Sequence, residues 1–124
     1  MALKQIRLEL ARTPESPEGN PNCGYEFVAP LDDHGKLDPQ KWARDKDKCT
    51  VRRFWEKRSD EQGLLKHHRG GNWAFFYGVD EAEEEPIFRF GKHSFVVGEY
   101  VSVTEHDGII RPFRVVSVRK MALT

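Results

Sequence analysis

The segment Val101–Val118, near the end of the chain, constrains the fold more than any other stretch of the sequence. Its β-branched and apolar residues alternate with polar ones on both sides of Asp107-Gly108, which predicts an antiparallel hairpin. A two-residue turn at this dipeptide would place Val101 opposite Arg114 and mix the apolar and polar faces of the ribbon. A three-residue loop, His106 to Gly108, with the glycine in the left-handed conformation, keeps the two faces separate.

This loop length also predicts how the ribbon joins the rest of the fold. Its register pairs Val101 with Phe113 and Val103 with Arg111, and it places Val101, Val103, Phe113 and Val115 on one face. Beyond Val115 the apolar phase slips to Val116 and Val118, which predicts a β-bulge or bend near Val115. Because bulges let strands turn the corners of a barrel, the hairpin indicates barrel closure.

Other parts of the chain carry the same period of two, which is typical of strands with one buried face. The alternating apolar residues are Ile6, Leu8 and Leu10 near the start, followed by Tyr25, Phe27, Ala29 and Leu31. Between these two sets, the density of Pro, Gly, Asn and Ser in Thr13–Gly24 predicts a loop. From Thr50 onward, β-branched and aromatic residues dominate and predict further strands.

One short helix is predicted near residues 38–46. Asp38 can accept hydrogen bonds from the free amides of the first turn, and Pro39 suits the first helical position. Leu37 can pack against Trp42 across that turn. The predicted fold class is therefore all-β and mainly antiparallel: a small barrel or half-open barrel of about six to eight strands with one helix, in a single domain over residues 1–124. A mixed α+β roll is the alternative.

Two stretches of the sequence resemble known proteins. The closing hairpin, GEYVSVTEHDGIIRPFRVVSV, resembles the hairpin that ends many small bacterial β-barrels and is similar to the last barrel hairpin of sortases. A sortase-like site would need a cysteine ahead of such a hairpin and an arginine after it, and neither Cys23 nor Cys49 matches that pattern. This resemblance carries no catalytic residue. The whole chain also resembles small bacterial proteins of unknown function, with Asn20–Trp55 as the most recognisable block, and this resemblance implies no activity.

The charge balance limits the partners of the chain. Lys and Arg number 20 and Asp and Glu also number 20, so the formal net charge of the 124 residues is zero. No global field would concentrate nucleic acid or an anionic membrane on such a protein. Charges between Lys4 and Arg12 interrupt any apolar signal segment, and no later segment approaches the length of a membrane span. We therefore expect a cytoplasmic protein without a membrane partner, with Cys23 and Cys49 as separate, reduced thiols.

Motifs for catalysis, phosphate binding and metal binding are missing from the sequence. There is no GxSxG elbow, and Gly70-Gly71 is too short for a phosphate-binding loop. His67 and His68 are neighbours on a predicted strand, so their side chains point to opposite faces. A trial metal set would combine His68 and His93 with one cysteine, but this spacing is not typical of a zinc site. We predict no catalytic residue, no metal and no cofactor.

The predicted hairpin around Gly70-Gly71 provides the candidate binding face. With these glycines as the turn, one face combines aromatic and basic side chains, and its cross-strand pairs are His68 with Trp73, Lys66 with Phe75, and Leu64 with Tyr77. The opposite face then forms core and contains Leu65, His67, Ala74 and Phe76. Aromatic area, cation–π partners and hydrogen-bonding tips are the mixture that recognition surfaces use. The alternative is that the helix bearing Trp42, or a second layer of sheet, covers this face.

The candidate ligand-binding residues are therefore Lys66, His68, Trp73 and Tyr77, with Trp55 as a further contributor. The preferred hypothesis is a non-catalytic module that binds an unidentified small ligand or a partner protein. Arginines beside aromatic residues at 52–55 and 88–90 make single-stranded nucleic-acid binding the second hypothesis, although zero net charge disfavours it. An enzyme with a histidine-containing site around His68 and His93 is the third.

Overall fold

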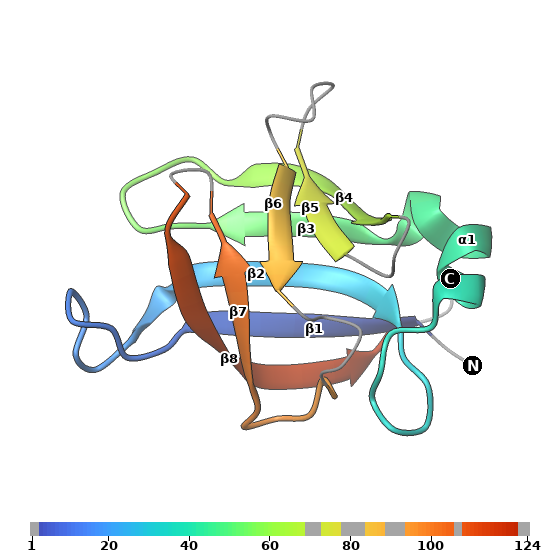
Figure 1. Cartoon of the computed structure of the whole chain (residues 1–124), viewed down its shortest axis with the longest axis horizontal. Helices are drawn as coiled ribbons and strands as arrows, with labels where there is room; N and C mark the ends of the chain where they lie inside the picture. The colour runs from blue at the N-terminus through green and yellow to red at the C-terminus, as the bar shows by residue number, and fades with distance from the viewer. Residues whose placement is uncertain (1–2, 69–72, 78–83, 89–93, 106–107, 122–124) are drawn as a thin grey trace.

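The computed structural model describes residues 3–68, 73–77, 84–88, 94–105 and 108–121, with 84–88 described as backbone. Eight strands form one closed antiparallel barrel in which each strand pairs with the next in sequence and the last pairs with the first (Figure 1). The strands are β1 (Leu3–Leu10), β2 (Asn20–Pro30), β3 (Thr50–Phe54), β4 (Glu61–His67), β5 (Trp73–Phe76), β6 (Glu84–Phe88), β7 (Tyr100–Thr104) and β8 (Ile110–Lys120). The predicted fold class is confirmed.

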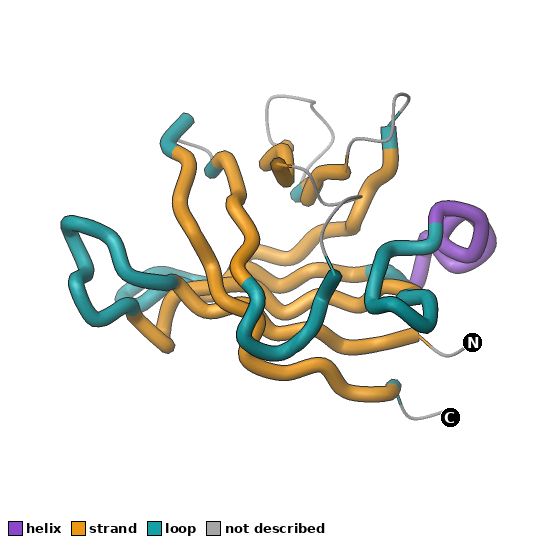
Figure 2. The backbone as a smooth tube through the Cα atoms, turned by 60° about the horizontal axis from the view of Figure 1, so that its bottom comes forward, coloured by secondary structure: helices purple, strands orange, loops and turns teal. Residues whose placement is uncertain are grey.

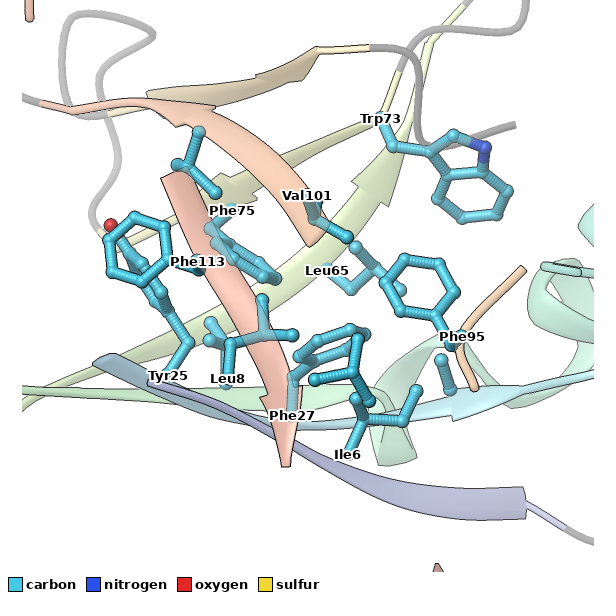
Figure 3. Packing of buried hydrophobic residues seen from close by; sticks show 14 of the residues in the cluster. Ile6, Leu8, Tyr25, Phe27, Leu65, Trp73, Phe75, Phe95, Val101 and Phe113 are labelled. Carbon is cyan, nitrogen blue, oxygen red and sulfur yellow. The ribbon is translucent and has the colours of Figure 1, made fainter. Parts of the chain in front are cut away.

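Alternation of side chains along the strands builds the core. The inward-facing residues of β1 and β2 are the apolar sets that the period of two predicted, and all of them are buried: Ile6, Leu8, Leu10, Tyr25, Phe27 and Ala29. Aromatic rings fill the centre of the barrel, where Phe75 lies with its ring centroid 4.9 Å from Tyr25 and 5.2 Å from Phe27. Figure 3 shows Phe95 and Trp73 toward one end of this core and Tyr25 and Phe113 toward the other.

The closing hairpin, β7 and β8, has the predicted register. Val101 lies opposite Phe113, Val103 lies opposite Arg111, and Gly108 has a φ of 79° in the left-handed region. His106 and Asp107, which complete the predicted loop, lie outside the described residues. The bulge is also confirmed, because β8 pairs with β1 through Val115 and then through Ser117, which leaves Val116 without an opposite residue.

The predicted helix, α1 (Pro39–Asp45), is confirmed together with its cap. The Asp38 carboxylate accepts hydrogen bonds from the backbone amides of Gln40 at 3.1 Å and Lys41 at 3.2 Å. A single 3₁₀ turn, Lys46–Lys48, follows and leads into β3. Figure 2 shows the helix outside the barrel, beside one end of the strands.

The loop predicted over Thr13–Gly24 is partly wrong. Strand β2 begins at Asn20, so only the first part of this segment, closed by hydrogen bonds among Thr13, Ser16 and Gly19, connects the strands. The pairing of β1 with β2 skips residues between Gly24 and Asn20, opposite Glu9 and Leu10. This irregularity explains the error, because a bulged strand start holds Pro, Asn and Gly, which otherwise indicate a loop.

Candidate functional site

The predicted binding face on β4 and β5 depends on a register that the structure does not have. Trp73 lies opposite His67, one residue away from the predicted partner His68, and Lys66 lies opposite Ala74. A slip of one residue moves every side chain of a strand to the other face. Trp73 therefore points into the barrel, and the predicted division of this hairpin into binding face and core is wrong. The predicted turn, Gly70-Gly71, lies outside the described residues.

Trp73 instead belongs to a group of rings that closes one end of the barrel. It is 2% exposed, and its ring lies 4.3 Å from that of His67 and 5.8 Å from that of Trp42, measured between centroids. The indole Nε1 of Trp42 donates a hydrogen bond of 2.9 Å to the carbonyl of Leu65. Burial, together with the neighbouring His68, lowers the pKa of His67 and favours its neutral form. We call Trp42, Leu65, His67 and Trp73 the apolar end.

The other predicted site residues are dispersed. The ammonium group of Lys66 lies over the ring of Phe76 at 3.9 Å, on the outer face of the barrel. His68 is exposed, whereas Tyr77 is partly buried and packs against the core. Trp55 follows β3, beside the ring of Phe113, which is buried in the barrel core. The five predicted residues therefore do not form one surface.

A group of charged side chains lies inside the barrel at the end where Trp55 is found. Tyr25 and Arg53 are cross-strand partners on β2 and β3, while Arg111 faces inward from β8 and Glu105 follows β7. Period-two alternation places Arg53 on the same face as Val51, and Glu105 on the same face as Val101 and Val103. We call Tyr25, Arg53, Glu105 and Arg111 the polar mouth.

The carboxylate of Glu105 organises the polar mouth. Its Oε2 accepts hydrogen bonds from the Tyr25 hydroxyl at 2.7 Å and from Arg53 Nε at 3.1 Å and Nη2 at 2.9 Å, while its Oε1 accepts one from Arg111 Nη1 at 2.9 Å. Glu105 is 4% exposed, the only charged residue in the described part of the chain that is buried. Four hydrogen-bond donors therefore hold one carboxylate that is shielded from solvent.

The electrostatics of Arg53 follow from this arrangement. Burial alone would lower the pKa of Arg53, but its interactions with Tyr25 and Glu105 outweigh burial and raise the pKa above its ordinary value. The guanidinium also lies 4.3 Å from the centroid of the Trp55 ring, which stacks against it. Glu61, a more exposed acid, lies 3.9 Å from Arg53 Nη1. Arg53 is therefore charged and fixed in orientation.

The described groups at this end of the barrel are poorly placed for acid–base or nucleophilic chemistry. The carboxylate of Glu105 already accepts four hydrogen bonds from a phenol and two guanidiniums, so its oxygens are not open to a substrate proton. Cys23, the buried thiol near this end, has its pKa raised by burial, against a hydrogen bond from the Glu56 backbone, and a thiol in this state is a poor nucleophile. Within the described ranges, no group of three His, Cys, Asp or Glu side chains could hold a metal, and His93 lies outside them.

Sequence reasoning missed three members of the polar mouth, although a signal was present. Arg53, Glu105 and Arg111 all occupy positions whose parity along predicted strands is inward, and the predicted hairpin register had already paired Arg111 with Val103. A charged side chain at an inward-facing position departs from the apolar pattern of a strand, and such departures are expected at functional or strained sites. The contact of Arg53 with Glu105 could not be predicted, because it joins strands that are 52 residues apart in sequence.

The outer face of the sheet carries the arginine and aromatic neighbours that suggested nucleic acid. The guanidiniums of Arg7 and Arg52 lie 4.3 Å and 5.0 Å from the ring centroid of Phe54, which is 7% exposed. Both arginines also hydrogen bond to the carboxylate of Glu26. A base could stack on Phe54 only after displacing these arginines, so the arrangement offers little support for a stacking platform.

No family model, no curated protein and no solved structure matches the chain. The similarity of the closing hairpin to sortases therefore stays an expectation from the sequence. The helices in the described part of the chain are too short and too polar to cross a membrane.

Proposed function

We propose that this protein is a non-catalytic binding module that docks a partner protein at the polar mouth. One observation carries the proposal: Glu105, almost fully buried, holds Arg53 and Arg111 in fixed positions at the end of the barrel. Closing a barrel does not require buried charges, since replacing them by apolar residues often stabilises a protein. Charged residues at this end of the barrel therefore suggest a role other than folding.

The surroundings of the polar mouth favour a protein partner. Ile109 and Ile110, at the start of β8, are 48% and 59% exposed, next in sequence to Arg111. Trp55 adds a half-buried indole stacked on Arg53. Trp and Arg are the residue types enriched at the centres of protein interfaces, and apolar surface around them excludes water. Trp55 is the one predicted site residue that this proposal retains. We further propose a cytoplasmic location, which suits the free thiols of Cys23 and Cys49.

Selection from a random peptide library displayed on phage tests the proposal. Immobilised protein should enrich peptides whose binding is lost in Trp55→Ala and in the double variant Ile109→Ser, Ile110→Ser. Leu64→Ser is the matched control, because Leu64 is also an exposed apolar side chain, 38% exposed, but lies on the outer side of β4. Circular dichroism confirms that each variant is folded. Enriched peptides that bind the Trp55 and Ile variants as well as the wild type would contradict the proposal.

A second candidate function is the binding of a small ligand in a surface groove. The groove has a volume of about 380 Å³ and lies between the β1–β2 connection and β7–β8, lined among others by Arg12, Glu18, Tyr100 and Arg114. Tyr100 is 58% exposed and provides a flat aromatic surface beside these charges. A thermal-shift screen of a compound library tests this function, since a ligand of the folded state raises the melting temperature. Hits whose effect survives Tyr100→Ala would count against the groove.

A further inference from the structure

The second half of β8 has a backbone edge that no strand covers. The first half, Ile110–Arg114, pairs with β7, and the backbone of Val115 bonds to the turn before β7. Beyond Val115, no strand or loop of the described residues pairs with this side of β8, whereas β1 pairs with the other side as far as Lys120. The bend of β8 in Figure 1 takes its second half away from β7 and along β1.

The hydrogen-bond pattern with β1 fixes which backbone groups lie on this edge. The amide of Met121 donates a hydrogen bond of 3.0 Å to the carbonyl of Leu3. In an antiparallel pair, every second residue directs its N–H and C=O to the partner strand, and the residues between direct theirs away. By this alternation, Arg119 bonds to β1, while Val118 and Lys120 direct four backbone groups to the uncovered side.

These four groups are open to solvent. Backbone groups that lack a protein partner in a folded chain bond to water instead. No hydrogen bond links them to any other residue in the described part of the chain, and the side chains on either side, those of Arg119 and Lys120, are exposed. A row of unpaired N–H and C=O groups of this kind is a template for one more strand. We call Val118–Lys120 the β8 edge.

The β8 edge is basic. Arg119 and Lys120 lie on it, Lys4 is the cross-strand neighbour of Lys120, and none of the three makes an ion pair with another described residue. Glu26 lies in the same surface hollow as Arg119, but two other arginines already bind its carboxylate. The positive charge of the β8 edge is therefore not neutralised within the described part of the chain.

This charge selects the occupant of the edge. Lys and Arg on an edge strand oppose pairing with a second copy, because pairing brings the same cations together. A strand of another protein that carries Asp or Glu has the complementary charge. The combination of free backbone groups and unpaired cations therefore favours an acidic strand over a second copy of this chain.

We propose that the β8 edge is a strand-addition site, at which an extended acidic segment of a partner protein joins the barrel sheet antiparallel to β8. The backbone of the segment pairs with the free groups of Val118 and Lys120. Its acidic residues lie opposite Arg119 and Lys120, and an apolar residue lies opposite Val118. β8 begins at the polar mouth and the edge is at its other end, so this site is separate from the proposed docking surface.

Titration with short peptides tests the site. Acetyl-Glu-Glu-Val-Thr-Val-amide places its first three residues opposite Lys120, Arg119 and Val118, and acetyl-Lys-Lys-Val-Thr-Val-amide is its match of opposite charge. Nitrogen-15 NMR follows the backbone amides of the folded protein at low salt. We expect the acidic peptide to shift the amides of Val118 and Lys120 saturably, with a dissociation constant of about 1 mM, and to slow their hydrogen exchange. The lysine peptide should do neither.

Backbone methylation of the acidic peptide separates strand addition from charge attraction. An N-methyl group on its third residue removes the N–H that faces Val118, so the dissociation constant should rise about fivefold or more. The matched control carries the N-methyl group on the second residue, whose N–H faces away from β8, and should bind as the unmodified peptide does.

Charge reversal tests the role of the cations. The double variant Arg119→Glu, Lys120→Glu should lose the acidic peptide and bind the lysine peptide instead. Lys57→Glu, Arg58→Glu is the matched control, because it reverses the same two charges in the exposed connection between β3 and β4 and should keep the acidic peptide. Circular dichroism confirms that both variants are folded. If the first is unfolded, the methylated peptides on the wild-type protein still decide.

Three outcomes would overturn the inference. Equal binding of the acidic and lysine peptides, or no saturable shift, would show that the edge does not select an acidic segment. Equal dissociation constants for the two methylated peptides would show attraction of charge without strand pairing. A dimer in analytical ultracentrifugation whose formation protects the Val118 amide from exchange would show that the occupant is a second copy of the chain.

Discussion

The two ends of this barrel are closed by opposite chemistry. At the apolar end, the rings of Trp42, His67 and Trp73 lie within 6 Å of one another between centroids, and the polar atom of Trp42 is satisfied by a backbone carbonyl. At the polar mouth, a buried carboxylate is held by a phenol and two guanidiniums. The strand residues of both groups face inward, but they come from different strands: β4 and β5 at the apolar end, and β2, β3 and β8 at the polar mouth.

The difference shows that the polar mouth, unlike the apolar end, carries a desolvation cost that folding does not require. Rings that pack edge to face stabilise the apolar end by removing area from water. Charges at the polar mouth first lose their hydration, and their mutual attraction only offsets that loss. The apolar end is therefore explained by stability alone, whereas the polar mouth calls for a further role. This contrast is the reason that we propose the polar mouth as the surface that binds a partner.

Truncation at the apolar end should have the largest effect on stability. Trp73→Ala removes a large side chain that is 2% exposed, and we expect a loss of about 3 to 5 kcal/mol in the free energy of unfolding. Urea denaturation followed by circular dichroism measures it. Phe76→Ala on the same strand is a control, since this side chain is half-buried and faces outward, and should cost less. Equal losses for the two variants would mean that Trp73 does not anchor this end.

At the polar mouth, the effect of removing charge should depend on how many partners are removed. Glu105→Ala removes the carboxylate that two largely desolvated guanidiniums share, and we expect a loss of about 3 kcal/mol in the free energy of unfolding. The triple variant Arg53→Met, Glu105→Leu, Arg111→Leu replaces the group by apolar side chains and should be as stable as the wild type or more so. Chemical denaturation measures both. A triple variant less stable than Glu105→Ala would show that the network itself stabilises the barrel.

The elements with strong local signals were predictable. The β7–β8 register followed from matching apolar residues across the turn, because only one loop length kept Val101 and Phe113 on the same face. The helix followed from Asp38 and Pro39, whose preferences for the first turn are intrinsic. In both cases a few adjacent residues contain the whole constraint, so no knowledge of distant contacts is needed.

The site was harder to predict because its constraints are not local. The Gly70-Gly71 pair suggested a two-residue turn, and the true register differs from that choice by one residue, enough to exchange core for surface at Trp73. Both faces of this hairpin carry apolar rings, so the apolar pattern could not reject the wrong register. The β7–β8 hairpin brings Glu105 and Arg111 together and the β2–β3 pairing brings Tyr25 and Arg53 together, but only closure of the barrel joins the two pairs.

The two thiols extend the comparison to alkaline pH. Cys49, near the apolar end, has its pKa raised to about 11 by burial. The unfolded chain loses this proton first, so the stability that the neutral thiol contributes is intact below the ordinary thiol pKa of 9.0 and is lost as pH rises from there through about 11. We expect the wild type to lose about 2 kcal/mol more than Cys49→Ala across this window.

Cys23, at the opposite end, provides the matched case. Its pKa is also raised by burial, but the hydrogen bond from the Glu56 backbone and the charge of Arg53 act in the opposite direction. Cys23→Ala should therefore change the alkaline loss of stability by less than Cys49→Ala does. Urea denaturation at several pH values between 8 and 11 measures these differences. A larger effect for Cys23 would show that the polar mouth desolvates its thiol more than the apolar end does.

Removal of the helix cap should have the smallest effect on the free energy of unfolding, and its structural effect should remain confined to the apolar end. Asp38→Ala removes two hydrogen bonds to the first-turn amides of α1, which we expect to cost about 1 kcal/mol. Asp38→Asn is the control, because asparagine caps helices about as well.

Since α1 carries Trp42, whose indole contacts Trp73 and the Leu65 carbonyl, the loosening of α1 should be visible as a change in the Trp42 indole resonance. The resonances of Arg53 and Arg111 at the polar mouth should not move. A shift of the arginine resonances in Asp38→Ala, absent in Asp38→Asn, would mean that the two ends are coupled through the barrel and that their roles are not separable.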